Sequence, residues 1–122
     1  METKLALTLV CAVLATSATA QAQGLTQPWD QITPLTPEDR AIIRSTVESK
    51  IHGKAPSTVV SWINPAKGGH SGTITLQSKL TKQGMACEQI QYQIMEPQST
   101  QQHGRYVFTS CQLSDGSWKL AD

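Results

Sequence analysis

The sequence predicts an α+β domain in which one N-terminal helix packs on an antiparallel sheet of four or five strands, with one disulfide. Two observations carry this prediction. Cys87 and Cys111 lie in two segments of strand-like alternation, 85–94 and 105–113, and a turn with a short third strand follows them. A segment that begins at Thr36 repeats its apolar residues at helical spacing.

Residues 1–20 have the pattern of a secretory signal peptide. Lys4 supplies the basic start, the apolar run 5–15 is too short to cross a membrane, and Ala18-Thr19-Ala20 fits the cleavage pattern. A retained membrane anchor is the less favoured alternative. The predicted mature chain has nine Lys and Arg against eight Asp and Glu and no second apolar run of transmembrane length. This balance argues against nucleic-acid binding.

Residues 21–35 are rich in Gln, Thr and Pro and lack periodicity, which predicts a linker or an arm docked by Trp29 and Ile32. The domain proper is expected to span residues 36–122.

The predicted helix opens at Thr36, a suitable N-cap, and Pro37 suits its first position. Its apolar stripe, which repeats every four residues, is expected to face the core. A partner-binding amphipathic helix is the alternative. Gly53 is a plausible C-terminal cap, and the stripe residues are Ile43, Val47 and Ile51.

Segments 57–64 and 73–78 predict a hairpin with a glycine-rich tip. Residues 79–84 are expected to form a polar turn, and residues 97–104 an exposed loop. If Cys87 faces Cys111 across an antiparallel pair, Ile90 falls opposite Phe108, and Tyr92 opposite Tyr106. This alignment of aromatic residues supports the disulfide, as does the pairing of cysteines in an exported chain.

Asp115–Gly116 predicts a two-residue type I′ turn. That turn would place Trp118 opposite Leu113, on the same side of the sheet as the disulfide.

The most site-like stretch is the loop between the first two strands. Glycines let backbone N–H groups approach an anion, although the spacing of a phosphate-binding loop is absent and a plain hairpin tip is favoured. Tryptophans could line a ligand cleft, but they are more often core residues in so small a domain. The candidate binding loop comprises Asn64, Lys67, Gly68, Gly69, His70 and Gly72, and the candidate aromatic face comprises Trp62 and Trp118.

The remaining chemistry-bearing residues do not form a recognisable constellation. The histidines have no ligand partners at metal-binding spacing, and Glu88 and Glu96 flank opposite ends of one strand. The two cysteines are not spaced as a redox motif. We therefore expect no catalytic residues, no metal and no cofactor.

The chain resembles the C-terminal domain of the 17 kDa surface antigen family, which comprises outer-membrane-associated proteins of proteobacteria and rickettsiae. The resemblance spans about residues 57–120 and rests on Trp62-Ile63-Asn64-Pro65, Gly68, Gly72, Cys87, Cys111 and Asp115-Gly116-Ser117-Trp118. Typical members carry a lipid-attachment cysteine and a glycine-zipper segment that this chain lacks, and an Arg where it has Glu88. The resemblance implies a small β-rich domain of the export compartment.

The sequence thus predicts an exported, non-enzymatic structural or binding module of the periplasm, either free there or associated with the outer membrane. Its partner is expected to be another envelope protein, and the oligomeric state stays open. A small inhibitor of an envelope enzyme, acting through residues 64–72 or 97–104, is one alternative. A ligand-binding protein that uses the tryptophan face is another.

Overall fold

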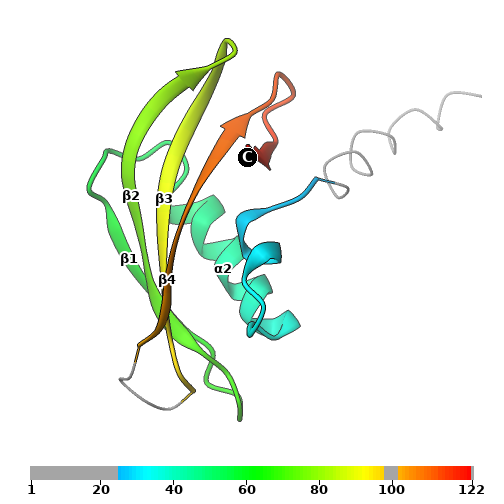
Figure 1. Cartoon of the computed structure of the whole chain (residues 1–122), viewed down its shortest axis with the longest axis vertical. Helices are drawn as coiled ribbons and strands as arrows, with labels where there is room; N and C mark the ends of the chain where they lie inside the picture. Colours follow the sequence, from blue (N-terminus) through cyan, green and yellow to red (C-terminus); the bar gives the residue numbers. More distant parts are fainter. Residues whose placement is uncertain (1–24, 98–101, 122) are drawn as a thin grey trace, which may run out of the picture.

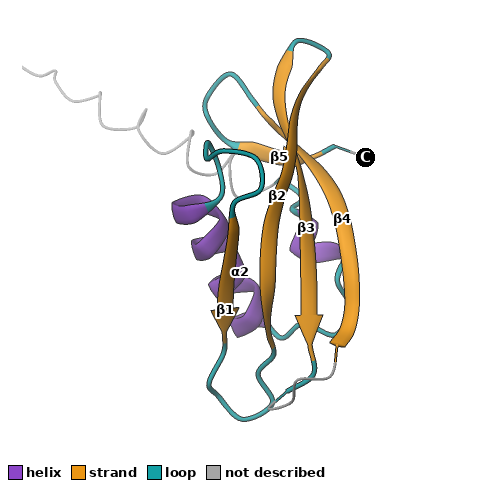
Figure 2. Ribbon diagram, turned by 90° about the vertical axis from the view of Figure 1, so that its left-hand side faces the viewer, coloured by secondary structure: helices purple, strands orange, loops and turns teal. Residues whose placement is uncertain are grey.

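The structure is a computed structural model that describes residues 25–97 and 102–121. The predicted signal peptide and the centre of the 97–104 loop lie outside these residues. Five antiparallel strands form one sheet in the order β1-β2-β3-β4-β5, and helix α2 covers one face of it (Figures 1 and 2). The predicted α+β class with one helix on an antiparallel sheet is confirmed.

The N-terminal arm docks on the domain through a short 3-10 helix, η2 (Pro28–Gln31). Trp29 and Ile32 are both buried, as the sequence predicts. The side chain of Gln27 donates a hydrogen bond to the carbonyl of Trp118 at 2.7 Å. Residues 25–35, the described part of the arm, are therefore a fixed part of the fold rather than a free linker.

Helix α2 (Pro37–Lys50) begins at the predicted N-cap. The Thr36 side chain accepts a hydrogen bond from the backbone of Asp39, and the Asp39 side chain accepts one from the backbone of Thr36, which completes a capping box. Ile43 and Val47 are fully buried. The apolar stripe is thus a core face, and the alternative of a partner-binding stripe is wrong.

The first hairpin joins β1 (Val59–Ile63) to β2 (Ser71–Lys82), and β2 is longer than predicted. Residues 79–82 continue the strand and pair with β3, so the expected polar turn over 79–84 is wrong. The turn consists of Gln83 and Gly84 alone, with φ of 52° and 79°. Two consecutive positive φ values match the twist of a two-residue hairpin, which lets both strands run up to it.

Strand β3 (Met85–Met95) pairs with β4 (Gln102–Gln112) in the predicted register. Cys87 faces Cys111 and forms the disulfide, with a Cα–Cα distance of 4.0 Å. Ile90 faces Phe108, and Tyr92 faces Tyr106, as expected from the aromatic ladder.

Strand β5 (Trp118–Leu120) is shifted by one residue from its predicted register, because Trp118 pairs with Gln112 rather than Leu113. The cause is a three-residue loop. Gly116 donates to the Leu113 carbonyl at 2.9 Å and has φ of 92°, as in a type I turn closed by a glycine bulge. The extra residue turns Trp118 onto the helix-covered face, away from the disulfide side.

The core lies between α2 and the even-numbered residues of β3, among which Ile90, Tyr92 and Ile94 are fully buried. The opposite face of the sheet has no helix over it in the described chain (Figure 1). Large apolar side chains that stay exposed are Val59, Ile63, Leu80 and Val107. In the described residues, no helix is long and apolar enough to cross a membrane.

Candidate functional site

Two buried carboxylates, each paired with a histidine, hold the two ends of α2. Asp39 lies in the first turn of the helix and pairs with His70, the residue directly before β2. Glu88 comes from β3 and pairs with His52, just past the last turn of the helix. Each pair fixes a neighbouring surface feature, so these two places are where the fold offers candidate sites.

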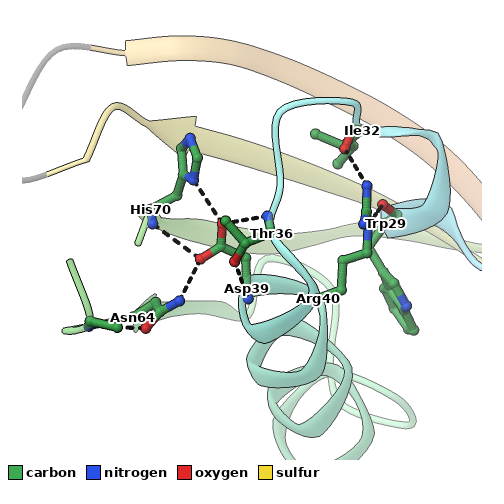
Figure 3. A network of polar contacts seen from close by, with 8 residues as sticks. Trp29, Ile32, Thr36, Asp39, Arg40, Asn64 and His70 are labelled. Atoms are coloured by element: carbon green, nitrogen blue, oxygen red, sulfur yellow. Dashed lines mark hydrogen bonds and ion pairs between the residues drawn. The ribbon is translucent and has the colours of Figure 1, made fainter. Parts of the chain in front are cut away.

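Asp39 is completely buried, and both of its carboxylate oxygens are occupied (Figure 3). Oδ1 accepts from the side-chain amide of Asn64 at 2.8 Å and from the backbone N–H of His70 at 3.1 Å. Oδ2 accepts from the backbone of Thr36 at 2.9 Å and lies 2.7 Å from His70 Nδ1. Because an ionised carboxylate only accepts hydrogen bonds, His70 Nδ1 carries the proton.

Burial by itself would raise the pKa of the Asp39 carboxyl. The hydrogen bonds from Thr36, Asn64 and His70 outweigh it, and the pKa is lowered below the ordinary value of an aspartate. Asp39 is therefore ionised at neutral pH and forms a charged, fully satisfied node between the helix and the hairpin.

This lowered pKa predicts a specific acid sensitivity. A carboxyl that is more acidic when folded stabilises the fold above its unfolded pKa, about 3.9, and that stabilisation is lost as pH falls through the folded pKa. We expect the Asp39 carboxyl carbon, followed by NMR, to titrate below the value of the unfolded chain. Urea midpoints should fall as pH drops below about 4. A titration of Asp39 above the unfolded value would contradict the arrangement.

The structure divides the predicted binding loop into a buried base and an exposed tip. Asn64 and His70 point inward onto Asp39, and Gly69 packs on the backbone of Asn64. Lys67 and Gly68 are exposed at the tip. The loop is thus braced from below, while its proposed contact with an anion stays a prediction that would now involve the tip alone.

Gly72, the last residue of that predicted loop, lies in β2 and has a packing role. A methyl group built on it would overlap the backbone carbonyl of Gln93 and crowd Trp62 Nε1. The residue is glycine because the neighbouring strand and the indole leave no room for a side chain.

Glu88 is 3% exposed and bonded at both oxygens. His52 Nδ1 lies 2.7 Å from Oε1, and the backbone N–H of Gly53 donates to Oε2 at 2.9 Å. The His52 ring in turn stacks on Trp118, with 4.0 Å between ring centroids and 3° between planes. Glu88 thereby orients the imidazole, and the imidazole supports one face of the indole.

A hollow of about 400 Å³ lies beside this stack. By strand pairing, Lys79, Thr81 and Ala86 share the helix-covered face with Glu88, and they are among the residues that line the hollow. Lys79 sits directly opposite Glu88 but forms no ion pair with another described residue, since Glu88 is taken by His52 and Gly53. The full lining is Gly53, Lys79, Leu80, Thr81, Ala86, Cys87, Glu88, Gln112 and Trp118.

The two tryptophans of the predicted aromatic face lie at opposite edges of the sheet. Trp62 is on β1 and belongs to the core, 5% exposed, whereas Trp118 is on β5 and half-buried beside the hollow. Trp62 Nε1 and the Tyr92 hydroxyl are buried without a hydrogen-bond partner in the described residues. Burial, and then the charge of Glu88, raise the pKa of Tyr92, so this phenol stays neutral. Of the two residues of the predicted aromatic face, Trp118 is the one that borders this hollow.

Sequence reasoning missed the roles of Asp39, His52 and Glu88. A signal exists for two of them: Thr36-x-x-Asp39 is a capping-box pattern, and Glu88 has the same strand parity as the core residues Ile90 and Tyr92. The partner of each carboxylate is remote in sequence, and only the fold reveals it. Among the described residues, no group of three or more His, Cys, Asp or Glu could hold a metal.

Comparison of the chain with protein-family models, with curated proteins and with solved structures finds no match. The resemblance to the 17 kDa surface antigen family therefore stays a prediction, and function is inferred from the residues described above.

Proposed function

We propose that the protein is an exported, non-enzymatic binding module of the cell envelope whose ligand occupies the hollow beside Trp118. The single observation that carries this proposal is the Trp118 ring, held flat against His52 at the border of a 400 Å³ hollow. Ligand pockets are typically preformed, concave and mostly apolar, with a few placed polar groups. An indole immobilised before binding loses little conformational freedom when a ligand arrives.

The charges around the hollow indicate the chemistry of the ligand. Both oxygens of Glu88 already accept hydrogen bonds, which leaves Lys79 as the charged lining residue without an ion-pair partner in the described chain. A ring that packs on Trp118 and carries a carboxylate or phosphate toward Lys79 would use both features. Acidic sugars of the envelope have this chemistry.

Three further observations support a non-enzymatic binding role and export. The Cys87–Cys111 disulfide is of the kind that persists outside the cytoplasm. In the buried acid–histidine pairs, all four carboxylate oxygens of Asp39 and Glu88 already take part in hydrogen bonds within the fold. This favours a role in holding neighbouring residues in place over a role in proton transfer. The leader-like sequence 1–20 agrees with export, and it lies outside the described residues.

The test of the hollow uses two sugars that differ by one charged group. N-acetylmuramic acid has the ring of N-acetylglucosamine plus a lactyl carboxylate, so we expect the acid to bind and to shift the amide signals of Gly53, Ala86 and Gln112. Lys79→Ala should weaken binding of the acid about fivefold, the effect of one partly exposed ion pair. Lys82→Ala, on the same strand but outside the lining, is the matched control.

Binding of neither sugar, or equal binding of both with no effect of Lys79→Ala, would count against this ligand chemistry. Export is tested separately by mass spectrometry of the protein from envelope fractions. A chain that starts at Gln21, after the predicted cleavage site, with Cys87 linked to Cys111 is expected, and a retained leader with free thiols would contradict export.

The inhibitor alternative is favoured by one observation, the braced loop. Asp39 holds Asn64 and His70 at the base of the loop, while Lys67 is exposed at the tip. A rigid protruding loop suits insertion into the cleft of an enzyme, because little entropy is lost on binding. Its test is stoichiometric inhibition of a purified envelope hydrolase that Lys67→Glu abolishes and Lys82→Glu leaves intact.

A further inference from the structure

Strand β1 forms one edge of the sheet, with α2 beside it (Figure 2). At its two ends, the backbone of Asn64 donates to His70, and the Thr58 carbonyl accepts from Leu76. Hydrogen bonding alternates along an antiparallel pair, so even-numbered residues of β1 direct their backbone groups toward β2. The N–H and C=O groups of Val59, Ser61 and Ile63 therefore point outward, away from every other described strand.

The side chains of these same residues lie on the uncovered face of the sheet. Val59 is 58% exposed and Ile63 is 67% exposed, the two highest values among the large apolar residues of 25–97 and 102–121. Ser61 lies midway between them and is also exposed. The exposed apolar groups are thus placed symmetrically about one small polar residue.

We propose that β1 pairs with β1 of a second copy of this chain, antiparallel and centred on Ser61. In that register Ser61 faces Ser61 of the partner subunit, and Val59 faces Ile63 of the partner subunit. The two-fold axis repeats the second contact, so both exposed apolar residues of each protomer gain an apolar cross-strand neighbour. The outward backbone groups are satisfied at the same time, and the two sheets become one continuous sheet across the axis.

Charge and strand chemistry favour a second copy as the occupant. Residues 57–64 include no charged side chain and no proline, so the edge lacks the features by which proteins usually block such pairing. The exposed apolar residues lie at equal distances on either side of Ser61, so an antiparallel second copy places apolar residues opposite apolar residues. An unrelated strand would match this pattern only by chance.

The position of α2 agrees with this pairing. Arg40 on one flank of the helix donates to the carbonyls of Trp29 and Ile32 in the arm (Figure 3). By helical geometry the opposite flank carries Ile42 and Thr46, which are half-buried, and at its two ends the exposed charged residues Glu38 and Lys50. The two-fold axis is perpendicular to the sheet, so the helices of both protomers would lie on the same face of the joined sheet.

Cysteine cross-linking tests the register. Ser61→Cys should form a disulfide-linked dimer under mild oxidation. Two Ser61 residues that face each other across the axis form a hydrogen-bonded pair, and the Cα atoms of such a pair lie within disulfide reach. Val59→Cys and Ile63→Cys are the matched controls. Each would face the other residue of the partner and not itself, so neither should cross-link efficiently. Peptide mapping of the Ser61→Cys dimer should show the two introduced cysteines linked to each other, with the Cys87–Cys111 bond intact.

Charge-paired variants test the energetics at the same exposed positions. Val59→Lys with Ile63→Lys places like charges opposite each other twice and should weaken dimerisation roughly tenfold in sedimentation equilibrium. Val59→Glu with Ile63→Lys places opposite charges there and should restore it. Circular dichroism confirms folding of each variant.

A protein that stays monomeric at millimolar concentration, or cross-linking that is equal at all three cysteine positions, would overturn the proposal. Equal affinities of the two charge variants would overturn it as well. The hollow beside Trp118 takes its β2 residues from 79–81, beyond the part of β2 (71–75) that pairs with β1. Sugar binding should therefore be unchanged in these variants, and the two proposals fail independently.

Discussion

Replacing Cys87 and Cys111 together by alanine is expected to lower the free energy of unfolding by about 3.5 kcal/mol. The bond joins residues 24 apart in sequence on neighbouring strands, so its loss frees a long loop in the unfolded chain. Both cysteines are buried, and the strands keep their backbone ladder without the bond. Guanidinium denaturation of the wild type and of the double variant measures the difference.

Reductant provides the internal control for this experiment. It should lower the stability of the wild type toward that of the double variant and leave the variant unchanged. A double variant as stable as the oxidised protein would show that the loop is already constrained in the unfolded state.

The second large effect is expected at Asp39. Asp39→Asn keeps the shape of the side chain but removes its charge and one acceptor oxygen, which leaves hydrogen-bond donors of Thr36 and His70 facing an amide. Breaking a buried pair of this kind costs about 3–5 kcal/mol. We expect a loss of that size in urea denaturation, together with faster hydrogen exchange at the backbone amide of His70.

Asp30 offers a matched control, because it occupies the same position of a capping box in η2. Its carboxylate accepts from the backbone of Gln27 at 2.9 Å but is exposed. Asp30→Asn should cost about 1 kcal/mol or less. If Asp39→Asn fails to fold, Asn64→Ala, which removes one of the four contacts, should cost about 1–2 kcal/mol. Equal effects at Asp30 and Asp39 would contradict the role assigned to the buried node.

The parts of the fold that could be predicted are those that neighbouring residues determine, or that two independent features of the sequence determine in the same way. The register of β3 and β4 is fixed by the disulfide and again by the opposition of Tyr92 and Tyr106. The start of α2 is fixed by Thr36 and Pro37, which act within a single turn. In each case the residue types that define the element also lie inside it or directly at its end.

The two wrong predictions concern turns, where the number of residues in the loop, and not their type, decides how the strands pair. Asp115–Gly116 is a strong turn signal for a two-residue loop and for a three-residue loop, and one residue of difference changes the face on which Trp118 lies. Gln83–Gly84 is a weaker signal, yet its two positive φ values let β2 and β3 run to the tip.

The site escaped prediction because its contacts join distant segments. Asp39 meets Asn64 and His70, which follow it by 25 and 31 residues, and Glu88 meets His52 across 36. A charged residue in the first turn of a helix is ordinarily explained by the helix dipole. Only the packing of the first hairpin over that turn makes Asp39 a buried partner of His70.

The contact between the arm and β5 determines which part of the protein can fold last. Every strand of the sheet pairs with its neighbour in sequence, so the hairpins can form one after another as the chain emerges. The arm is the exception, because Gln27 bonds to Trp118 across 91 residues, and Leu120 donates to the carbonyl of Thr26. The arm, which emerges early, must therefore wait for the last strand, and a chain stopped before β5 leaves it without a place to dock.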